Sequence, residues 1–210
     1  MQGLEKSEKF RDRIAGRYAR QAINGVEAYH RTLDRTKKYL RPDDTVLDYG
    51  CGTGSISIEI TGYVSRINAI DLSSRMIAIA KRRASGRRIQ NTRFSHTTID
   101  DAMLEKESFD VILAFHVLHL LEDTQATLHR VSELLKPDGL LISITPCLGE
   151  SRMLFSILLP VVHALRIVPY VRLLELSELD GLIAQQGFET VEKESSNQIP
   201  PDYFVVARKL

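Results

Sequence analysis

The chain has 210 residues, of which 43% are hydrophobic and 26% charged, and its 28 basic residues nearly balance its 27 acidic residues. These proportions are typical of a globular protein with one well-buried domain, and the balanced charge gives no reason to expect nucleic acid or another polyanion as partner. The two cysteines, Cys51 and Cys147, form no metal-type pair, so we expect neither a metal site nor a disulfide framework.

The first 44 residues are expected to be mostly helical. Apolar or aromatic residues recur at helical spacing from Ser7 to Leu40, after which Arg-Pro-Asp-Asp at 41–44 breaks the pattern. The first residues lack the apolar core of a signal peptide, so we expect a reducing, cytoplasmic setting.

The stretch from Val46 to Gly54 is the most informative of the chain. Its apolar start and Asp48 predict the buried end of a parallel strand, and its glycines predict a tight turn into a helix. Such a turn offers backbone N–H groups and a helix N-terminus to a small polar ligand. The dinucleotide fingerprint needs a glycine at position 55, where this chain has Ser, which weakens an interpretation as an NAD site.

Strands and helices alternate beyond this loop. The apolar runs predict strands at 66–72, 93–97, 109–115, 140–144, 187–191 and 203–207. Ser73 and Ser74 are suited to begin a helix, a second helix is expected over 124–135, and Lys-Pro-Asp-Gly at 136–139 predicts a turn. The alternation predicts a parallel, doubly wound α/β sheet in a single domain.

Five sequence features occur together in this order. They are Asp-x-Gly-x-Gly-x-Gly at 48–54, Asp71 about 20 residues later, Phe-Asp-Val-Ile at 109–112, Leu-Leu-Lys-Pro-Asp-Gly at 134–139 and Phe-Val-Val-Ala-Arg at 204–208. Together they resemble the class I S-adenosylmethionine (SAM) methyltransferases. The similarity is greatest to the small-molecule branch that includes quinone-biosynthesis methyltransferases, where Arg-Tyr also precedes the sheet, as Arg17-Tyr18 does here.

The resemblance implies a Rossmann-like, seven-stranded sheet with strand order 3-2-1-4-5-7-6 and an antiparallel last strand. It also implies one domain over residues 1–210, with a helical cover at 1–44 and a helical lid at 148–178. SAM would bind at the carboxyl ends of strands one, two and four, with S-adenosylhomocysteine (SAH) as the product.

The resemblance also implies which residues bind the cofactor. Asp71 would bind the ribose hydroxyls, Leu72 and Met76 would flank the adenine, and Asp48 would orient the glycine loop. The full cofactor set is Tyr18, Asp48, Gly50, Cys51, Gly52, Gly54, Asp71, Leu72, Met76, Ile99, Asp100, Phe115 and His116.

Structural alternatives exist for several of these residues. Asp48 could cap the following helix, Tyr18 could be a core tyrosine, and Leu72 and Met76 could be ordinary packing residues. Cys51 is expected to contact SAM through its backbone, because methyl transfer needs no covalent enzyme intermediate.

His116 and His119 are the histidines nearest the expected transfer point. A neutral imidazole accepts a proton near neutral pH, so either could act as a general base, although a histidine at a strand end also serves in packing or capping.

Two further segments leave alternatives open. Basic residues at 81–83 and 87–88 lie where a helix is expected to end, which favours a solvated surface over a nucleic-acid site. The apolar segment at 153–176 is too interrupted to span a bilayer and could be a lid over a lipophilic pocket, a homodimer face or a peripheral, membrane-surface helix.

The chain is thus expected to be a SAM-dependent methyltransferase that acts on a small, lipophilic molecule. The alternatives are a SAM-binding protein without transferase activity and an NAD-binding oxidoreductase.

Overall fold

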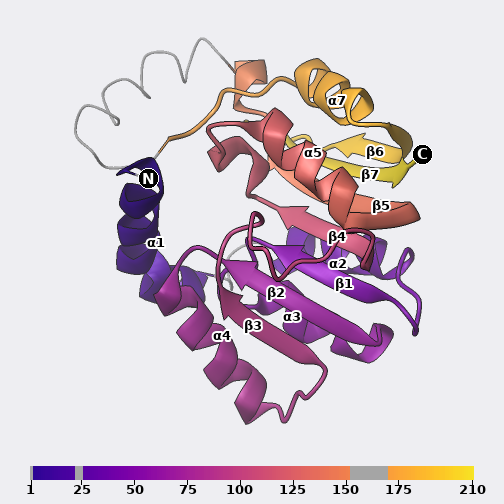
Figure 1. Cartoon of the computed structure of the whole chain (residues 1–210). Coiled ribbons are helices and arrows are strands. Elements are labelled where there is room, and N and C mark those ends of the chain that lie inside the picture. The colour runs from indigo at the N-terminus through magenta and orange to yellow at the C-terminus, as the bar shows by residue number, and fades with distance from the viewer. Residues whose placement is uncertain (1, 22–25, 152–169) are drawn as a thin grey trace. The chain divides into compact units, whose positions relative to one another are not determined.

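A computed structural model describes residues 2–21, 26–151 and 170–210 (Figure 1). Seven strands form one sheet in the order β3-β2-β1-β4-β5-β7-β6, which confirms the predicted order. The strands are β1 (Thr45–Tyr49), β2 (Arg66–Asp71), β3 (Thr92–His96), β4 (Phe109–Phe115), β5 (Leu135–Pro146), β6 (Phe188–Ser195) and β7 (Asp202–Lys209). The α-helices with described bounds are α1 (Gln2–Gln21), α2 (Val26–Lys37), α3 (Ser55–Ile60), α4 (Ser74–Gly86), α5 (Thr124–Leu134) and α7 (Leu176–Gln185).

Strand directions follow the predicted pattern. β1 pairs with β2, and β2 with β3, in parallel, whereas β7 lies antiparallel to both β5 and β6. Short 3-10 turns lie at η1 (Thr61–Tyr63), η2 (Leu118–Leu120) and η3 (Leu148–Ser151). The last strand is therefore antiparallel, as the resemblance implied.

Local sequence explains where the helices after β2 and β4 begin. Ser73 is the N-cap of α4, and its hydroxyl accepts a hydrogen bond from the backbone N–H of Met76. Asp123 caps α5 in the same way by accepting from the N–H of Ala126. These caps satisfy N–H groups that have no partner within their helices.

The structure differs from the sequence expectation in two places. The helical region at 7–40 is divided into α1 and α2, with residues 22–25 outside the described part. The turn predicted at 136–139 belongs to β5, which begins at Leu135. Asp138 keeps the left-handed φ of 61° that a turn residue adopts, while Lys209 of β7 donates to the carbonyl of Leu135 at 2.7 Å, so a distant partner holds the early start of the strand.

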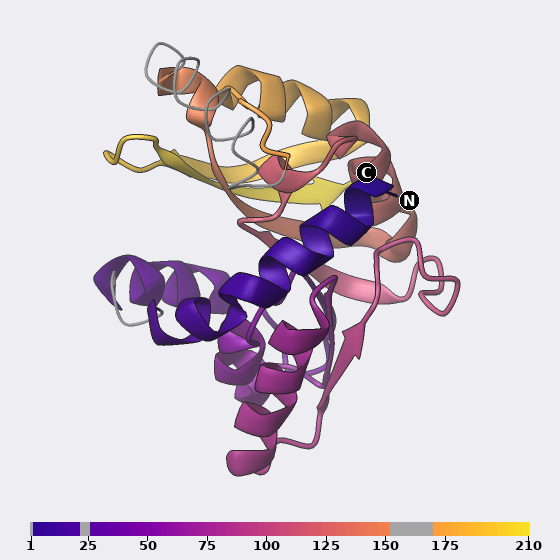
Figure 2. The same ribbon diagram turned by 90° about the vertical axis from the view of Figure 1, so that its left-hand side faces the viewer.

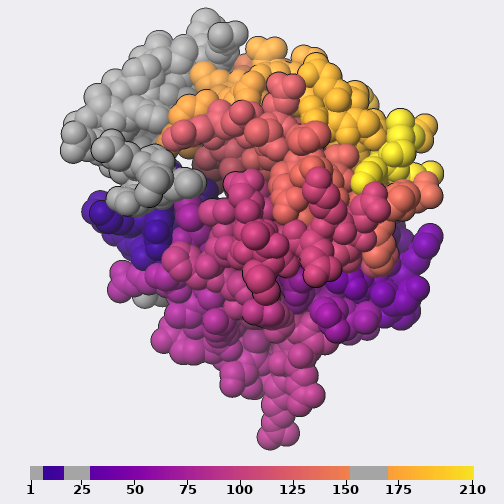
Figure 3. All heavy atoms as spheres, in the orientation of Figure 1, coloured from indigo at the N-terminus to yellow at the C-terminus, as the bar shows by residue number. Residues whose placement is uncertain are grey.

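The chain divides into two compact units, and β4 contributes to both. One unit holds residues 1–101 and 109–111, and the other holds residues 102–108 and 112–210. In the first unit, the end of α4 and the turn after it project at the bottom of the space-filling view (Figure 3). The single domain over 1–210 stays a prediction.

The predicted lid at 148–178 is described only at its ends. Residues 148–151 form η3 and α7 begins at Leu176, but residues 152–169 lie outside the described part, as does most of the apolar segment at 153–176. Within the described ranges, no helix is both long and apolar enough to cross a bilayer.

Candidate functional site

The glycine loop between β1 and α3 has the left-handed backbone that its sequence predicts. Gly50, Gly52 and Gly54 have φ values of 77°, 53° and 74°, which residues with a Cβ rarely adopt. A Cβ at Gly54 would lie 2.7 Å from Cε1 of Phe94, so this position also lacks space for a side chain. The loop therefore depends on glycine for its shape and for its packing.

The N–H groups of this loop are already used within the first unit. Those of Gly50 and Cys51 donate to the carbonyl of Ile70 at 2.9 and 3.0 Å, and that of Gly52 donates to Oδ2 of Asp71 at 2.9 Å. The N–H of Gly54 donates to the carbonyl of Cys51 at 2.9 Å. Four N–H groups of the loop therefore have partners within the chain, three of them at the end of β2, and the expectation that the turn offers N–H groups to a ligand stays a prediction.

Asp71 and the glycine loop meet directly. The Asp71 side chain is 3% exposed, and its two oxygens accept from the N–H groups of Gly52 and Ser73, at 2.9 and 2.7 Å. These bonds fix the carboxylate at the carboxyl end of β2. Each oxygen retains a lone pair that can accept a hydroxyl hydrogen, as a ribose ligand would require.

Asp48 lies in β1, and its carboxylate contacts the first turn of α3, as its structural alternative predicted. Its side chain is 3% exposed and accepts from the hydroxyl and the backbone N–H of Ser57. Burial, together with the charge of Asp71, raises the pKa of Asp48 to about 6, although the Ser57 hydrogen bonds oppose this. The capping contact is therefore present, and it leaves a cofactor role untested.

Cys51 is held as a neutral thiol. Burial, with the charges of Asp48 and Asp71, raises its pKa well above the usual value. A thiol that resists ionisation is a poor nucleophile, in agreement with the expectation that Cys51 plays no covalent role.

Of the adenine candidates, Met76 lies next to the glycine loop. Met76 is buried, and its Sδ would lie 3.5 Å from a Cβ at Gly52. Leu72 is half-buried, Ile99 is buried, and Asp100 is exposed.

The second unit contains Phe115 and His116. The backbone of His116 has a φ of 52°, a strained value for a residue with a Cβ, and its N–H donates to the carbonyl of Ile144 at 2.7 Å. Nδ1 of His116 lies 3.9 Å from Oδ1 of Asp202. Desolvation lowers the pKa of His116, and the nearby charge of Asp202 opposes this.

His119 follows in η2. It is half-buried, and its carbonyl accepts from the backbone N–H of Arg172 at 2.8 Å. The side chain of Tyr18, in α1, lies outside the described residues.

The basic residues at 81–83 and 87–88 do not all make the same kind of contact. Arg83 donates to the carbonyl and hydroxyl of Thr53 at 3.1 and 3.0 Å, and Arg87 pairs with Glu59 at 2.6 Å. Neither guanidinium is therefore free to serve a polyanion.

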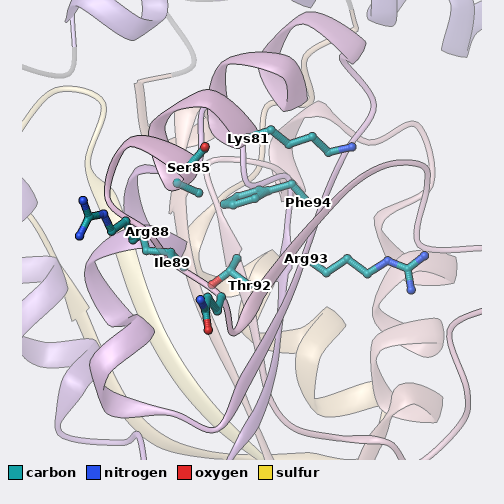
Figure 4. Close-up of a pocket in the computed structure, with 9 residues that line it drawn as sticks. Lys81, Ser85, Arg88, Ile89, Thr92, Arg93 and Phe94 are labelled. Carbon is teal, nitrogen blue, oxygen red and sulfur yellow. The ribbon is translucent and has the colours of Figure 1, made fainter.

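A further group of cations lines an open hollow of about 610 Å³ beside the end of α4 and β3. Figure 4 shows the charged ends of Arg88 and Arg93 pointing to opposite sides of it. Because these charges do not converge, the hollow does not resemble an anion site, in agreement with a solvated surface. Within the described ranges, no group of three or more metal-ligating side chains is found.

Two contacts of the site residues were not predicted from the sequence. Asp12 of α1 binds Ser73, and Asp202 of β7 approaches His116. Both join residues more than 60 positions apart in the chain, and no local pattern in the sequence marks such a pairing.

Comparisons with known proteins agree with this fold. The uncharacterized methyltransferase YcgJ of Bacillus subtilis is 25% identical over 155 residues, which are 73% of this chain and 61% of YcgJ. The mitochondrial ubiquinone biosynthesis O-methyltransferase of Schizosaccharomyces pombe is 30% identical over 153 residues, which are 68% of this chain and 54% of that protein. The chain thus spans little more than half the length of these curated relatives.

Solved structures show the same fold. The crystal structure of YcgJ has a TM-score of 0.72 and 20% identity, and the match covers 86% of this chain and 98% of that one. Geranyl diphosphate C-methyltransferase from Streptomyces coelicolor A3(2), solved with Mg²⁺, geranyl diphosphate and SAH, has a TM-score of 0.73 and 17% identity over 87% of this chain and 78% of that one.

A family model described as a methyltransferase domain matches residues 40–195, which is well over half of the chain. The matched region contains the glycine loop, Asp71 and the end of β4. The chain therefore belongs to the methyltransferase domain family.

Proposed function

We propose that this chain is a SAM-dependent methyltransferase that acts on a small, lipophilic molecule. The observation that supports it best is the chemistry of the glycine loop, where two buried carboxylates, Asp48 and Asp71, flank a turn whose glycine N–H groups are hydrogen-bonded within the chain. A ligand at this turn meets mainly hydrogen-bond acceptors and negative charge. SAM carries a sulfonium and an ammonium, both positive, and ribose hydroxyls that can donate.

The same chemistry disfavours the NAD alternative. A pyrophosphate binds where a helix N-terminus and a glycine loop offer free N–H groups. Here the N–H of Gly52 donates to Asp71, and Asp48 accepts from Ser57 in the first turn of α3. Two anionic phosphates would lie beside two carboxylates, at an electrostatic cost that a cationic cofactor avoids.

The residue roles carry over from the sequence as proposals. Asp71 accepts from the ribose hydroxyls, Leu72, Met76 and the Ile99–Asp100 backbone surround the adenine, and Asp48 faces the methionine end. The other proposed cofactor contacts are Tyr18, Gly50, Cys51, Gly52, Gly54, Phe115 and His116. The SAH bound in the S. coelicolor enzyme supports a cofactor of this class for the shared fold.

The bound sulfonium supplies an activated methyl group, so the protein mainly orients the acceptor and excludes water. An acceptor with an ionisable O–H also needs a base, and we propose His116 or His119 for that role. The lowered pKa of His116 keeps its imidazole neutral, and so able to accept a proton, at neutral pH.

Calorimetric titration tests the cofactor assignment. We expect SAM and SAH to bind wild-type protein with micromolar affinity, NAD not to bind, and Asp71→Ala to lose binding of both, because the variant lacks the ribose acceptor. Asp110→Ala is a matched control that changes a half-buried strand carboxylate bound to the N–H of Thr45, and it should keep its affinity. Binding of NAD, or of no nucleotide at all, would overturn the proposal.

A screen of methyl acceptors tests the proposed substrate class and the proposed base. With SAM present, lipophilic phenols and quinone precursors should be methylated faster than charged, polar acceptors, because the apolar segment at 153–176 is proposed to cover the acceptor. On a phenolic acceptor, substitution of the base by Gln at His116 or His119 should lower kcat about 10²-fold or more. Tight SAM binding with no turnover on any pool would favour a SAM-binding protein without transferase activity.

A further inference from the structure

Asp12, near the middle of α1, binds the start of α4. Its carboxylate accepts from the hydroxyl of Ser73 at 2.5 Å, from the backbone N–H of Arg75 at 3.1 Å and from the hydroxyl of Ser74 at 3.4 Å. Figures 1 and 2 show α1 running beside the beginning of α4. A carboxylate is favoured there because the first N–H groups of a helix lack partners and carry partial positive charge.

Ser73 connects this contact to the proposed ribose site. Its side chain is fully buried, its hydroxyl donates to Asp12, and its backbone N–H donates to Oδ1 of Asp71 at 2.7 Å. The same hydroxyl accepts from the N–H of Met76 at 3.1 Å. One buried residue thus joins a carboxylate of α1 to the carboxylate proposed to bind ribose.

A second contact of α1 lies close to the same segment. Glu8 lies one turn before Asp12, on the same face of the helix, and its Oε1 is 3.1 Å from Nε2 of His96. That nitrogen also lies 2.9 Å from the carbonyl of Leu72. α1 therefore approaches residues 71–73 at two places, directly at Ser73 and through His96 beside the carbonyl of Leu72.

We infer that α1 is coupled to the cofactor site, with Asp12 as a positioning residue that acts through Ser73 on Asp71. Docking of α1 on α4 and binding of the cofactor then stabilise one another. The inference rests on the proposed function and deepens it. If Asp12 were only a structural cap on α4, it would hold α1 in place, but cofactor binding would not change the docking of α1.

Reciprocal linkage separates coupling from simple capping, because each event must strengthen the other by the same factor. Hydrogen exchange of the amides of α1 is measured with and without saturating SAH, and SAH affinity is measured by calorimetry. We expect SAH to slow exchange in α1 about tenfold in wild type and much less in Asp12→Ala, which should bind SAH about tenfold more weakly. Asp12→Asn, which keeps one acceptor oxygen for Ser73, should restore part of both effects and serves if Asp12→Ala does not fold.

Asp34→Asn is the control, since it changes an exposed helical aspartate in α2 and should leave both readouts unchanged. If SAH binds wild type and Asp12→Ala equally, or binds without slowing exchange in α1, the inference is wrong while the proposed function stands. If wild type does not bind SAH, both are wrong.

Discussion

Asp48 has a carboxylate whose charge the fold disfavours. Burial and the nearby charge of Asp71 raise its pKa from 3.8 to about 6, despite the hydrogen bonds from Ser57. Because the folded pKa lies above the unfolded one, the folded state binds more protons between these two values. The resulting stabilisation is complete below the unfolded pKa and is lost as pH rises through about 6.

Replacement of Asp48 by Asn removes this pH dependence. The amide stays neutral and keeps an acceptor for Ser57, so the stability of Asp48→Asn relative to wild type should rise by about 2.5 kcal/mol between pH 4 and pH 8. Urea unfolding across this range measures the difference. A constant offset between the two proteins at all pH values would show that Asp48 does not titrate as inferred.

At the scale of elements, α4 contacts the glycine loop and the start of α3 through an arginine side chain. Arg83 of α4 donates to the carbonyl and hydroxyl of Thr53 and, at 3.0 Å, to the hydroxyl of Ser55. The neighbouring Arg82 is exposed. Two adjacent arginines of one basic run therefore differ in function, because only Arg83 lies on the helix face turned toward the loop.

Substitution of Arg83 and of Arg82 tests whether Arg83 stabilises the glycine loop. Arg83→Ala should lower the free energy of unfolding by about 1–3 kcal/mol, because it removes three hydrogen bonds from a charged donor, and should weaken SAH binding. Arg82→Ala should stay within about 0.5 kcal/mol of wild type and bind SAH normally. Equal effects of the two substitutions, measured by urea unfolding and calorimetry, would contradict a specific role for Arg83.

Elements also show the limit of local sequence patterns. The start of α4 at Ser73–Ser74 and the full extent of β4 were predicted, because caps and apolar runs are local signals. The early start of β5 was missed, since the segment at 136–139 has the composition of a turn. Lys209 holds that segment from β7, and no pattern within ten residues of Leu135 indicates this contact.

At the scale of the whole molecule, cofactor binding should stabilise the folded chain. A ligand that binds only the folded state at about 100 times its Kd adds about 2.7 kcal/mol. For a chain of this length, SAH should therefore raise Tm by about 5–10 °C. Differential scanning fluorimetry measures this shift, which Asp71→Ala should abolish, and an equal shift with NAD would contradict the assignment.

Sequence alone determined the α/β class and the left-handed glycine turn, and the family resemblance supplied the strand order. The class and the turn follow from periodicity, glycine spacing and the regular alternation of strands and helices, which are properties of short segments. Only the tertiary structure decided that the glycine N–H groups of the loop are hydrogen-bonded within the chain, that Asp48 accepts from Ser57 with a raised pKa, and that Asp12 reaches Ser73. Burial and hydrogen bonds between distant residues depend on how the elements pack, so local sequence patterns do not predict them.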